Sequence, residues 1–589
     1  MRIILAVLLT IGLGASPLLA GAAGETAKEE TPTAVGSASA TAEKSKGAVT
    51  PENSATEIEI QDLRSLVEEQ RAKLEEQSAA VEAQRAELEA QREALKSQLL
   101  KMEALEEKLG ATPSEPEATS ASSSSAVVTA TPISKTTAAL ANPAASSAQK
   151  ENDEVSPLQF KIGSAYITPV GFMDFTGVFR SHDEGSGIGT NFAGIKYGNT
   201  FNTNLSELRF SMQNSRIGFR VDAMVKGAHV IGYMESDYLG NNPGNAAVSS
   251  NSNTLRSRLY WVDVQKDKWE LLAGQTWSLI TPGRAGISPL PGNVFFTQDI
   301  DVNYQAGLVW GRIPELRFVV RPTNKVTIAV ALDSPEQYVG GSSGGPTITY
   351  PAALVGLAGS QLNNGGSTVV LNTPNLAPDF IAKAAFDPSS KLHFEFGGLV
   401  RDFKVWNPLP LPAGTSFSKI GAGGFVNLNV ELLKSFRVVT NNFWADGGGR
   451  YIFGQVPDLI VRADNTLSPI KAASTVSGFE FTHRSTFLYA YYGGIYVYRN
   501  LALDANGLSI IGYGDIISSA QNRNIQEETI GFNQTLWRDA KFGALNFMGQ
   551  YSYLNRKPWA KLDPSNAHVN MVFWNLRYTL PGSAPTLEK

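Results

Sequence analysis

The sequence contains no cysteine among its 589 residues. This absence excludes a thiolate metal site, a catalytic thiol, a disulfide scaffold and a lipid anchor on an N-terminal cysteine. Charged residues are also sparse, at 18% of the chain. The formal net charge of −5 by itself argues neither for nor against a nucleic-acid partner, and we expect none.

Long hydrophobic runs are missing after the N-terminus, where no stretch reaches the roughly 18 apolar residues that a membrane helix needs. This excludes a helical membrane protein. At the N-terminus, Arg2 precedes an apolar run from Ile3 to Leu13, and a small-residue stretch ends in Ala20-Gly21-Ala22. The pattern predicts a signal peptide over residues 1–22. The mature chain is then either soluble and exported or a membrane β-barrel.

Two segments rich in small and polar residues enclose a regular repeat. Residues 23–56 are expected to be disordered, and residues 110–156 form a Ser/Ala/Pro-rich linker. Between them, residues 57–109 carry an apolar side chain at every seventh position: Ile60, Val67, Leu74, Val81, Leu88, Leu95, Met102 and Leu109. Strict seven-residue spacing predicts an α-helical coiled coil rather than a single amphipathic helix, with a length of roughly 75 Å. The spacing does not fix the number of chains; we favour a trimer because of the segment that comes after the linker.

Residues 157–589 change to a period of two. In the last such segment Val572, Trp574 and Leu576 share one parity, while Asn575 and Arg577 occupy the other. Apolar side chains facing outward and polar ones facing inward are typical of a membrane barrel, although a soluble sandwich also alternates.

The connections separate these two folds, because short turns alternate with long loops. Short polar turns occur near 226–227, 266–268, 321–325, 387–390, 433–435, 483–485 and 538–540, and longer links at 181–204, 240–253, 278–314, 334–377, 407–417, 447–473, 499–525 and 556–566. This alternation predicts an all-β transmembrane barrel of about 16 antiparallel strands, since a sandwich has no reason to segregate its loops by length. The barrel would lie in the outer membrane, with the preceding coiled coil in the periplasm.

Side-chain parity predicts which residues line the lumen. Leu255, Leu259 and Trp261 are taken as lipid-facing, which turns the residues between them inward. The predicted pore-lining set is Arg209, Arg216, Arg220, Arg256, Arg258, Tyr260, Arg401 and Arg577. The third long loop is the expected constriction, through Arg284, Asp299, Asp301, Asn303 and Tyr304.

The inward arginines allow two interpretations. They could attract small anions, because guanidinium groups bind carboxylates bidentately and a low-dielectric wall focuses their field. Alternatively, they could pair with lumen carboxylates such as Glu207, Glu235, Asp237 and Glu395 and only stiffen the wall. The residues alone favour neither.

An enzymatic barrel is the third possibility. The five histidines form no H-E-x-x-H motif, and no G-x-S-x-G motif is present. His393, beside Glu395 on the same strand face, is the one inward histidine placed in a strand, and a structural role is expected for it. We therefore expect no enzyme, no cofactor and no metal site.

Several short motifs resemble the DcaP-like outer-membrane porin family. They are residues 214–219 (NSRIGF), 255–260 (LRSRLY), 272–278 (LAGQTWS) and 449–451 (GRY), in a chain whose parts also follow the family's order. The resemblance implies trimeric channels that pass small anions, including dicarboxylates, with arginines at the constriction. It favours the anion interpretation for Arg216, Arg256 and Arg258.

The expected function is passive diffusion of small hydrophilic solutes, anionic ones in particular, through a homotrimer embedded in outer-membrane lipids. The alternative is a structural envelope protein whose coiled coil tethers the outer membrane to peptidoglycan.

Overall fold

The structure is a computed structural model that describes residues 156–198, 200–241, 251–290, 294–298, 304–341, 347–355, 361–363, 377–407, 413–517, 521–561 and 567–582. The predicted signal peptide, disordered segment, coiled coil and most of the linker lie outside these residues. Within them, no helix combines the length and apolar character needed to cross a membrane.

One antiparallel sheet of eighteen strands contains most of the described chain. Its strands are β1 (Phe160–Ile162), β2 (Ala165–Arg180), β3 (Glu207–Ser211), β4 (Arg216–Val225), β5 (Ala228–Asp237), β6 (Arg256–Lys266), β7 (Trp269–Trp277), β8 (Arg312–Thr323), β9 (Val326–Asp333), β10 (Asp379–Ser389), β11 (Leu392–Asn407), β12 (Thr415–Leu433), β13 (Phe436–Asp446), β16 (Lys471–His483), β17 (Thr486–Val497), β20 (Asn522–Asp539), β21 (Gly543–Pro558) and β22 (Ala567–Thr579).

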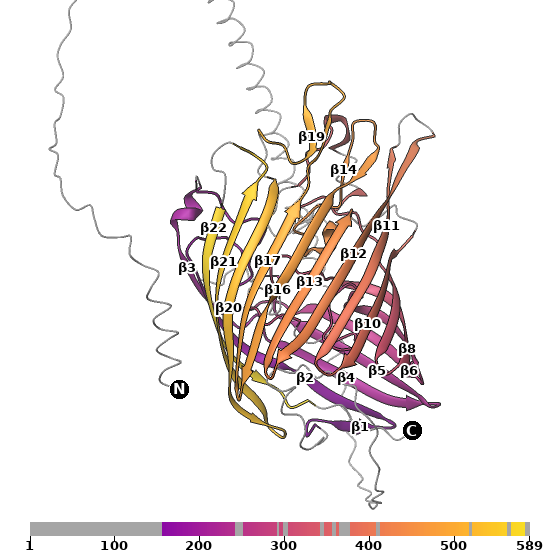
Figure 1. The fold of residues 1–589 in the computed structure, drawn as a ribbon, viewed down its shortest axis with the longest axis vertical. Helices are drawn as coiled ribbons and strands as arrows, with labels where there is room; N and C mark the ends of the chain where they lie inside the picture. The colour runs from indigo at the N-terminus through magenta and orange to yellow at the C-terminus, as the bar shows by residue number, and fades with distance from the viewer. Residues whose placement is uncertain are drawn as a thin grey trace, which may run out of the picture. The chain divides into compact units, whose positions relative to one another are not determined.

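The sheet closes into a barrel of sixteen strands (Figure 1). Two of the eighteen segments do not count as separate strands of the barrel wall. β3 and β4 pair one after the other with β2 and together form one interrupted strand of the wall. β1 is a short segment that pairs over three residues with the start of β2. Closure is made by β22 and β2, which pair from Phe172 with Thr579 to Arg180 with Met571. The predicted number of strands is confirmed.

The connections alternate in length as predicted. β4 and β5 are joined by Lys226 and Gly227, both with positive φ, as a tight two-residue hairpin turn requires. Asp267, Ser435 and Arg484 adopt positive φ in three other short turns. The long loops lie at the opposite end of the strands and contain the small hairpins β14 (Leu459–Val461) with β15 (Leu467–Pro469) and β18 (Asn500–Leu503) with β19 (Ile510–Tyr513). They also contain the 3-10 turns η2 (Phe201–Asn204), η4 (Ala352–Leu354) and η5 (Gly449–Tyr451).

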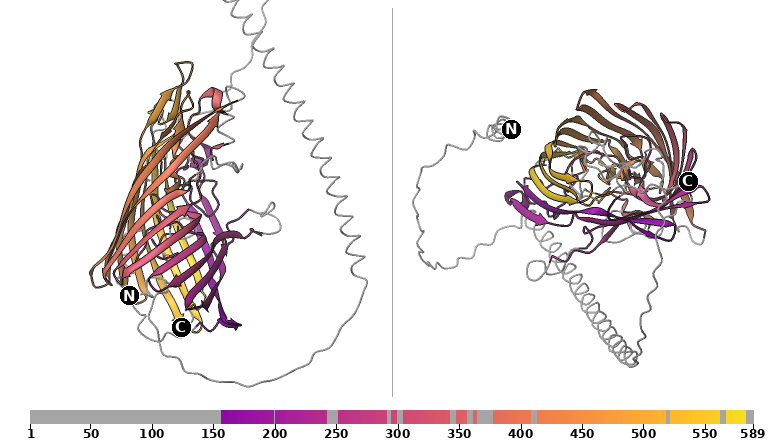
Figure 2. Two further views of the ribbon diagram at one scale, coloured as in Figure 1. Left: turned by 90° about the vertical axis from the view of Figure 1, so that its right-hand side faces the viewer. Right: turned by 90° about the horizontal axis from the view of Figure 1, so that it is seen from below.

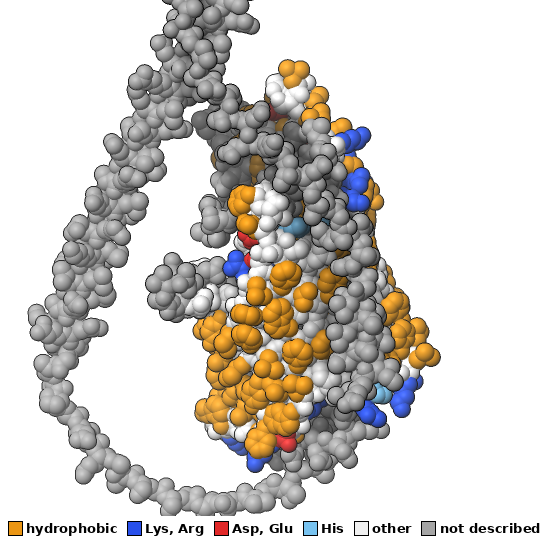
Figure 3. Space-filling view, turned by 90° about the vertical axis from the view of Figure 1, so that its left-hand side faces the viewer, with side chains coloured by type: hydrophobic (Ala, Val, Ile, Leu, Met, Phe, Trp, Pro, Cys, Tyr) orange, Lys and Arg blue, Asp and Glu red, His pale blue; other side chains and the backbone are white. Residues whose placement is uncertain are grey.

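The outer face of the barrel is apolar over much of its height. Hydrophobic side chains cover the lower part of the face seen in Figure 3. In β22, Val572 and Leu576 are 41% and 45% exposed, whereas Phe573 between them is 1% exposed. This alternation confirms the predicted parity of the last strand, and it is the arrangement expected of a wall between lipid and a polar interior.

The parity prediction is wrong for three residues of β6, Leu259, Tyr260 and Trp261. Tyr260 faces outward, where its hydroxyl lies 3.2 Å from that of Ser236, while Leu259 and Trp261 are buried on the inner face. The cause is a β-bulge: β5 pairs Glu235 with Leu259 and Ser236 with Ser257, so Arg258 has no partner opposite it. Because a bulge adds one residue to one strand, it reverses the parity beyond it.

Candidate functional site: the barrel lumen

The third long loop, between β7 and β8, runs through the interior of the barrel. Its Arg284 donates two hydrogen bonds, of 2.9 and 2.6 Å, to the Glu480 carboxylate on β16. Its Gln298 N–H donates to Gln550 on β21, and its Ala306 N–H donates to Glu527 on β20. Figure 2, in its view from below, shows loop segments within the ring of strands. The loop therefore reaches wall strands far around the barrel from those that it connects.

The beginning of this loop is fixed by the residues that end β7. Thr276 donates a side-chain hydrogen bond to the Pro289 carbonyl, and Ser278 donates one to the Asp333 carboxylate on β9. Both belong to the motif at residues 272–278 that supports the family resemblance. The motif thus serves to turn the chain from the wall into the lumen.

Aromatic rings of the third loop pack against Phe453 of the loop that contains η5. The Tyr304 and Trp310 rings stack 4.2 Å apart, and Phe453 packs against both. Tyr304 is 1% exposed, so its role in this structure is packing. Of the predicted constriction residues, Arg284 and Tyr304 lie inside the barrel, whereas Asp299, Asp301 and Asn303 lie outside the described residues.

Each predicted lumenal arginine forms an ion pair with a carboxylate. The N···O distances are 2.7 Å for Arg209 with Glu207, 3.6 Å for Arg216 with Glu235, 2.8 Å for Arg220 with Asp222, 2.7 Å for Arg256 with Asp237, 2.7 Å for Arg258 with Glu235, 2.9 Å for Arg401 with Asp379 and 2.7 Å for Arg577 with Asp174. The partners include three of the four carboxylates named from the sequence. The fourth, Glu395, pairs with Lys383 instead.

Three of these arginines form one group with two carboxylates. Arg258 contacts both Glu235 and Asp237, at 2.7 and 2.8 Å, with its side chain fully buried. Arg216 and Arg256 each contact one of the same two carboxylates. We call these five residues the arginine group. Its formal charges are three positive and two negative, so it carries an excess of one positive charge.

A second ionic network joins the wall to the loop that contains η5. Arg401 on β11 contacts Asp379 on β10 at 2.9 Å and Asp458 of the loop at 2.7 Å. The Tyr451 hydroxyl donates to Asp379 as well, at 2.9 Å. Burial raises the pKa of the Asp458 carboxyl, an effect that Arg401 partly opposes. The 449–451 motif therefore lies in a buried contact between loop and wall.

The first long loop, between β2 and β3, is also drawn inward. Arg180 lies 2.7 Å from Glu207 and 3.9 Å from Glu184, and it donates to the carbonyls of Gly187 and Gly189. Burial raises the pKa of the Glu184 carboxyl above its ordinary value, against the lowering influence of Arg180. Arg180 was not predicted from the sequence, although its alternation with Phe179 could have indicated an inward side chain.

The histidines are engaged in hydrogen bonds or ring contacts. His393 lies 2.8 Å from Asp387 and 3.1 Å from Glu395, as a structural histidine would. His229 on β5 also faces inward, 2.8 Å from Asp222, and was not identified as inward from the sequence. Among the described residues, no three acidic or histidine side chains come together in a way that could hold a metal ion.

These features define a closed antiparallel β-barrel with an apolar exterior, a charged interior and long loops folded inward. No family model matches the chain, and no curated protein sequence matches it either.

Several solved porin structures are similar to it. The DcaP channel of Acinetobacter baumannii is 15% identical with a TM-score of 0.49, over 72% of this chain and 100% of that one. The anion-selective porin of Comamonas acidovorans is 9% identical (TM-score 0.39; 70% and 99%), and OprB of Pseudomonas putida is 11% identical (0.37; 70% and 94%). The first of these is a DcaP channel, as the family resemblance named from the sequence would lead one to expect, but identities at this level do not carry function between proteins.

Proposed function

We propose that this chain is an outer-membrane porin, which lets small hydrophilic solutes diffuse passively across the membrane. The supporting observation is the inverted distribution of side chains: apolar groups cover the outside of the barrel, and the ionised groups are gathered within. Lipid favours the first arrangement and water the second. The proposal places the barrel in the outer membrane and the coiled coil in the periplasm, joins the copies into a homotrimer, and assigns no enzymatic activity, cofactor or nucleic-acid partner.

We further propose that small anions, carboxylates and dicarboxylates in particular, are the preferred solutes. The excess positive charge of the arginine group supports this preference, since a low-dielectric wall focuses the field of such a group into the bore. Glu235 and Asp237 cancel two of the three arginine charges, so only one positive charge remains. The preference is therefore expected to be modest.

Conductance of the purified full-length protein in planar bilayers tests both parts. Discrete channel currents are expected, with a reversal potential in a salt gradient that corresponds to anion preference and is screened at high salt. Cation preference would refute the anion proposal while leaving the channel intact. Bilayers that stay electrically silent would refute the channel itself.

Anion attraction by the arginine group can be separated from selectivity of other origin. Arg256→Gln is the suitable variant, because Arg256 is the most exposed of the three arginines, with 36% of its side chain accessible. Its loss should move the reversal potential toward cation preference. Lys266→Gln, at the far end of the same strand, is the matched control and should leave the potential unchanged.

A further inference from the structure

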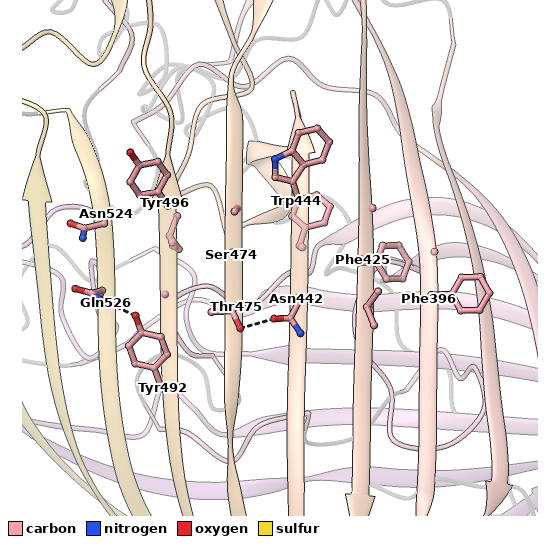
Figure 4. A pocket seen from close by; sticks show the side chains of 17 residues that line it. Phe396, Phe425, Asn442, Trp444, Ser474, Thr475, Tyr492, Tyr496, Asn524 and Gln526 are labelled. Carbon is pink, nitrogen blue, oxygen red and sulfur yellow. Dashed lines mark hydrogen bonds between the residues drawn. The ribbon is translucent and has the colours of Figure 1, made fainter.

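The outer wall of the barrel has a hollow of about 840 Å³ (Figure 4). It lies across β11, β12, β13, β16, β17 and β20, and its lining includes the polar side chains of Asn442, Thr475 and Gln526. Phe443 and Ile525, which are adjacent in sequence to Asn442 and Gln526, are buried on the inner face. The polar side chains of the hollow therefore face away from the lumen.

These residues belong to two rows that cross four neighbouring strands. Strand register aligns Thr440, Ser477, Tyr492 and Glu528 in one row, and Asn442, Thr475, Gly494 and Gln526 in the next. Hydrogen bonds run both within and between the rows: Thr475 donates to Asn442 in the same row at 2.9 Å, and Gln526 donates to the Tyr492 hydroxyl of the other row at 2.8 Å. The Thr440 and Ser477 hydroxyls lie 2.7 Å apart. We call these eight residues the polar rows.

Polar rows are unsuited to contact with lipid chains. Hydrocarbon offers no hydrogen-bond partners, so the donors and acceptors that these side chains do not satisfy among themselves would stay unsatisfied in contact with lipid. The opposite side of the barrel is built differently, since Val262 on β6 and Leu271 on β7 are exposed there at 44% and 40%. The polar rows thus interrupt an outward face of β13, β16, β17 and β20 that is otherwise apolar, where Trp444, Phe479 and Ile530 are 50%, 54% and 53% exposed. Such an interruption is expected where protein rather than lipid covers the wall.

The sequence indicates that the contacting protein is another copy of this chain. Residues 57–109 carry the heptad repeat, and coiled coils bring copies of one chain together at high local concentration. In addition, Gly424, Ala473 and Gly494 line the hollow with small side chains, which permit close approach of another wall. We propose that the polar rows are the surface through which barrels of neighbouring copies of this chain pack against one another. This rests on the membrane location given under Proposed function.

Distance measurements on spin-labelled protein test the proposal. The absence of cysteine allows a single label on the full-length chain at Thr475→Cys in the polar rows, or at Val262→Cys on the opposite wall. Sixteen tilted strands give a barrel diameter of roughly 30 Å. In reconstituted membranes, intermolecular distances between labels at position 475 should be shorter than those at position 262 by about that diameter or more.

Distances that are shorter at position 262, equal at the two positions, or absent at both would overturn the proposal. Absence would mean that the barrels do not associate, and a label at 475 that is fully accessible to lipid-dissolved oxygen would mean that lipid occupies the hollow. Conductance of the same two labelled proteins keeps this result separate from the porin proposal. If both conduct while the distances fail, only the location of the contact is wrong.

Discussion

Arg258 illustrates how a charge is held inside the wall. Its guanidinium is fully buried between the Glu235 and Asp237 carboxylates. Removing a carboxylate from this buried group is costly, because the arginines lose one of their two counterions and no water takes its place. The β-bulge at this residue places both carboxylates within reach, since it lets Arg258 and Leu259 both point inward.

Asp237→Asn should therefore destabilise the barrel strongly, by about 3–5 kcal/mol. The control is Arg209→Gln, which breaks a pair in which 47% of the arginine side chain is accessible, and it should cost at most about 1 kcal/mol. Urea unfolding of both variants in lipid vesicles, followed by tryptophan fluorescence, measures the difference. Equal stabilities would show that the ion pairs of the arginine group contribute little to the fold.

Glu184 should make docking of the first loop depend on pH. Its pKa is raised in the docked loop, chiefly by burial, so the docked loop binds a proton more tightly than an undocked one. Docking is then most stable below the ordinary pKa of glutamate and weakens as pH rises through the raised value. A fluorophore at Lys196→Cys should become more accessible to a neutral quencher as pH rises above the ordinary pKa of a glutamate carboxyl.

Glu184→Gln should abolish this pH dependence, because the amide does not ionise. Asp183→Asn, which changes the adjacent carboxylate in the same loop, should retain it. An unchanged profile in Glu184→Gln would show that another group controls the loop.

Parity identified most inward arginines correctly but could not reveal their partners. Arg216 and Glu235 lie on neighbouring strands, and only the register of β4 with β5 brings their side chains together. Tyr260 was misplaced because a bulge has no distinct signal in a sequence read with period two. The direction in which an individual side chain points therefore depends on local irregularities that composition does not encode.

At the scale of elements, the turns were the most predictable part. Polar residues such as Lys226-Gly227 mark a tight turn directly, and alternation marks the strands beside it. The interruption between β3 and β4 was missed, as were the hairpins within the long loops. Those hairpins are held by tertiary contacts, for example Asn500 donating to the carbonyl of Ser468. Such contacts join segments that are distant in the sequence.

The third loop should be loosened by Glu480→Gln. Arg284 makes two charged hydrogen bonds with this carboxylate, and charged hydrogen bonds contribute about 1.5–3 kcal/mol each. Loss of the charge should shift the loop toward undocked conformations, which we expect to appear as larger and noisier single-channel currents. Glu431→Gln, which weakens a half-buried pair with Arg437 near a short turn, is the control and should leave the currents unchanged. Identical currents in both variants would mean that the loop does not limit flow.

At the scale of the whole molecule, the predicted coiled coil and the described barrel can be tested separately. Deleting residues 57–109 should leave the conductance of each barrel unchanged, because the proposed pore would lie in the barrel alone. The deletion should lower the fraction of protein that remains oligomeric in mild detergent, as measured by light scattering. If envelope integrity fails while the oligomer persists, the coil acts as a tether to the cell wall. That result would favour the alternative function.

The seam between β2 and β22 has a consequence for how the molecule is made. It joins residues about four hundred positions apart, as in the hydrogen bond from Asn575 to Asp174, and Ser156 donates across it to the Pro581 carbonyl. Until the last strand has been delivered, the first has no neighbour on one side and the sheet keeps two open edges, which invite aggregation. If the chain is exported as proposed, it must therefore be shielded by an escort in transit until its final segment arrives, and truncation of that segment should send the chain to degradation.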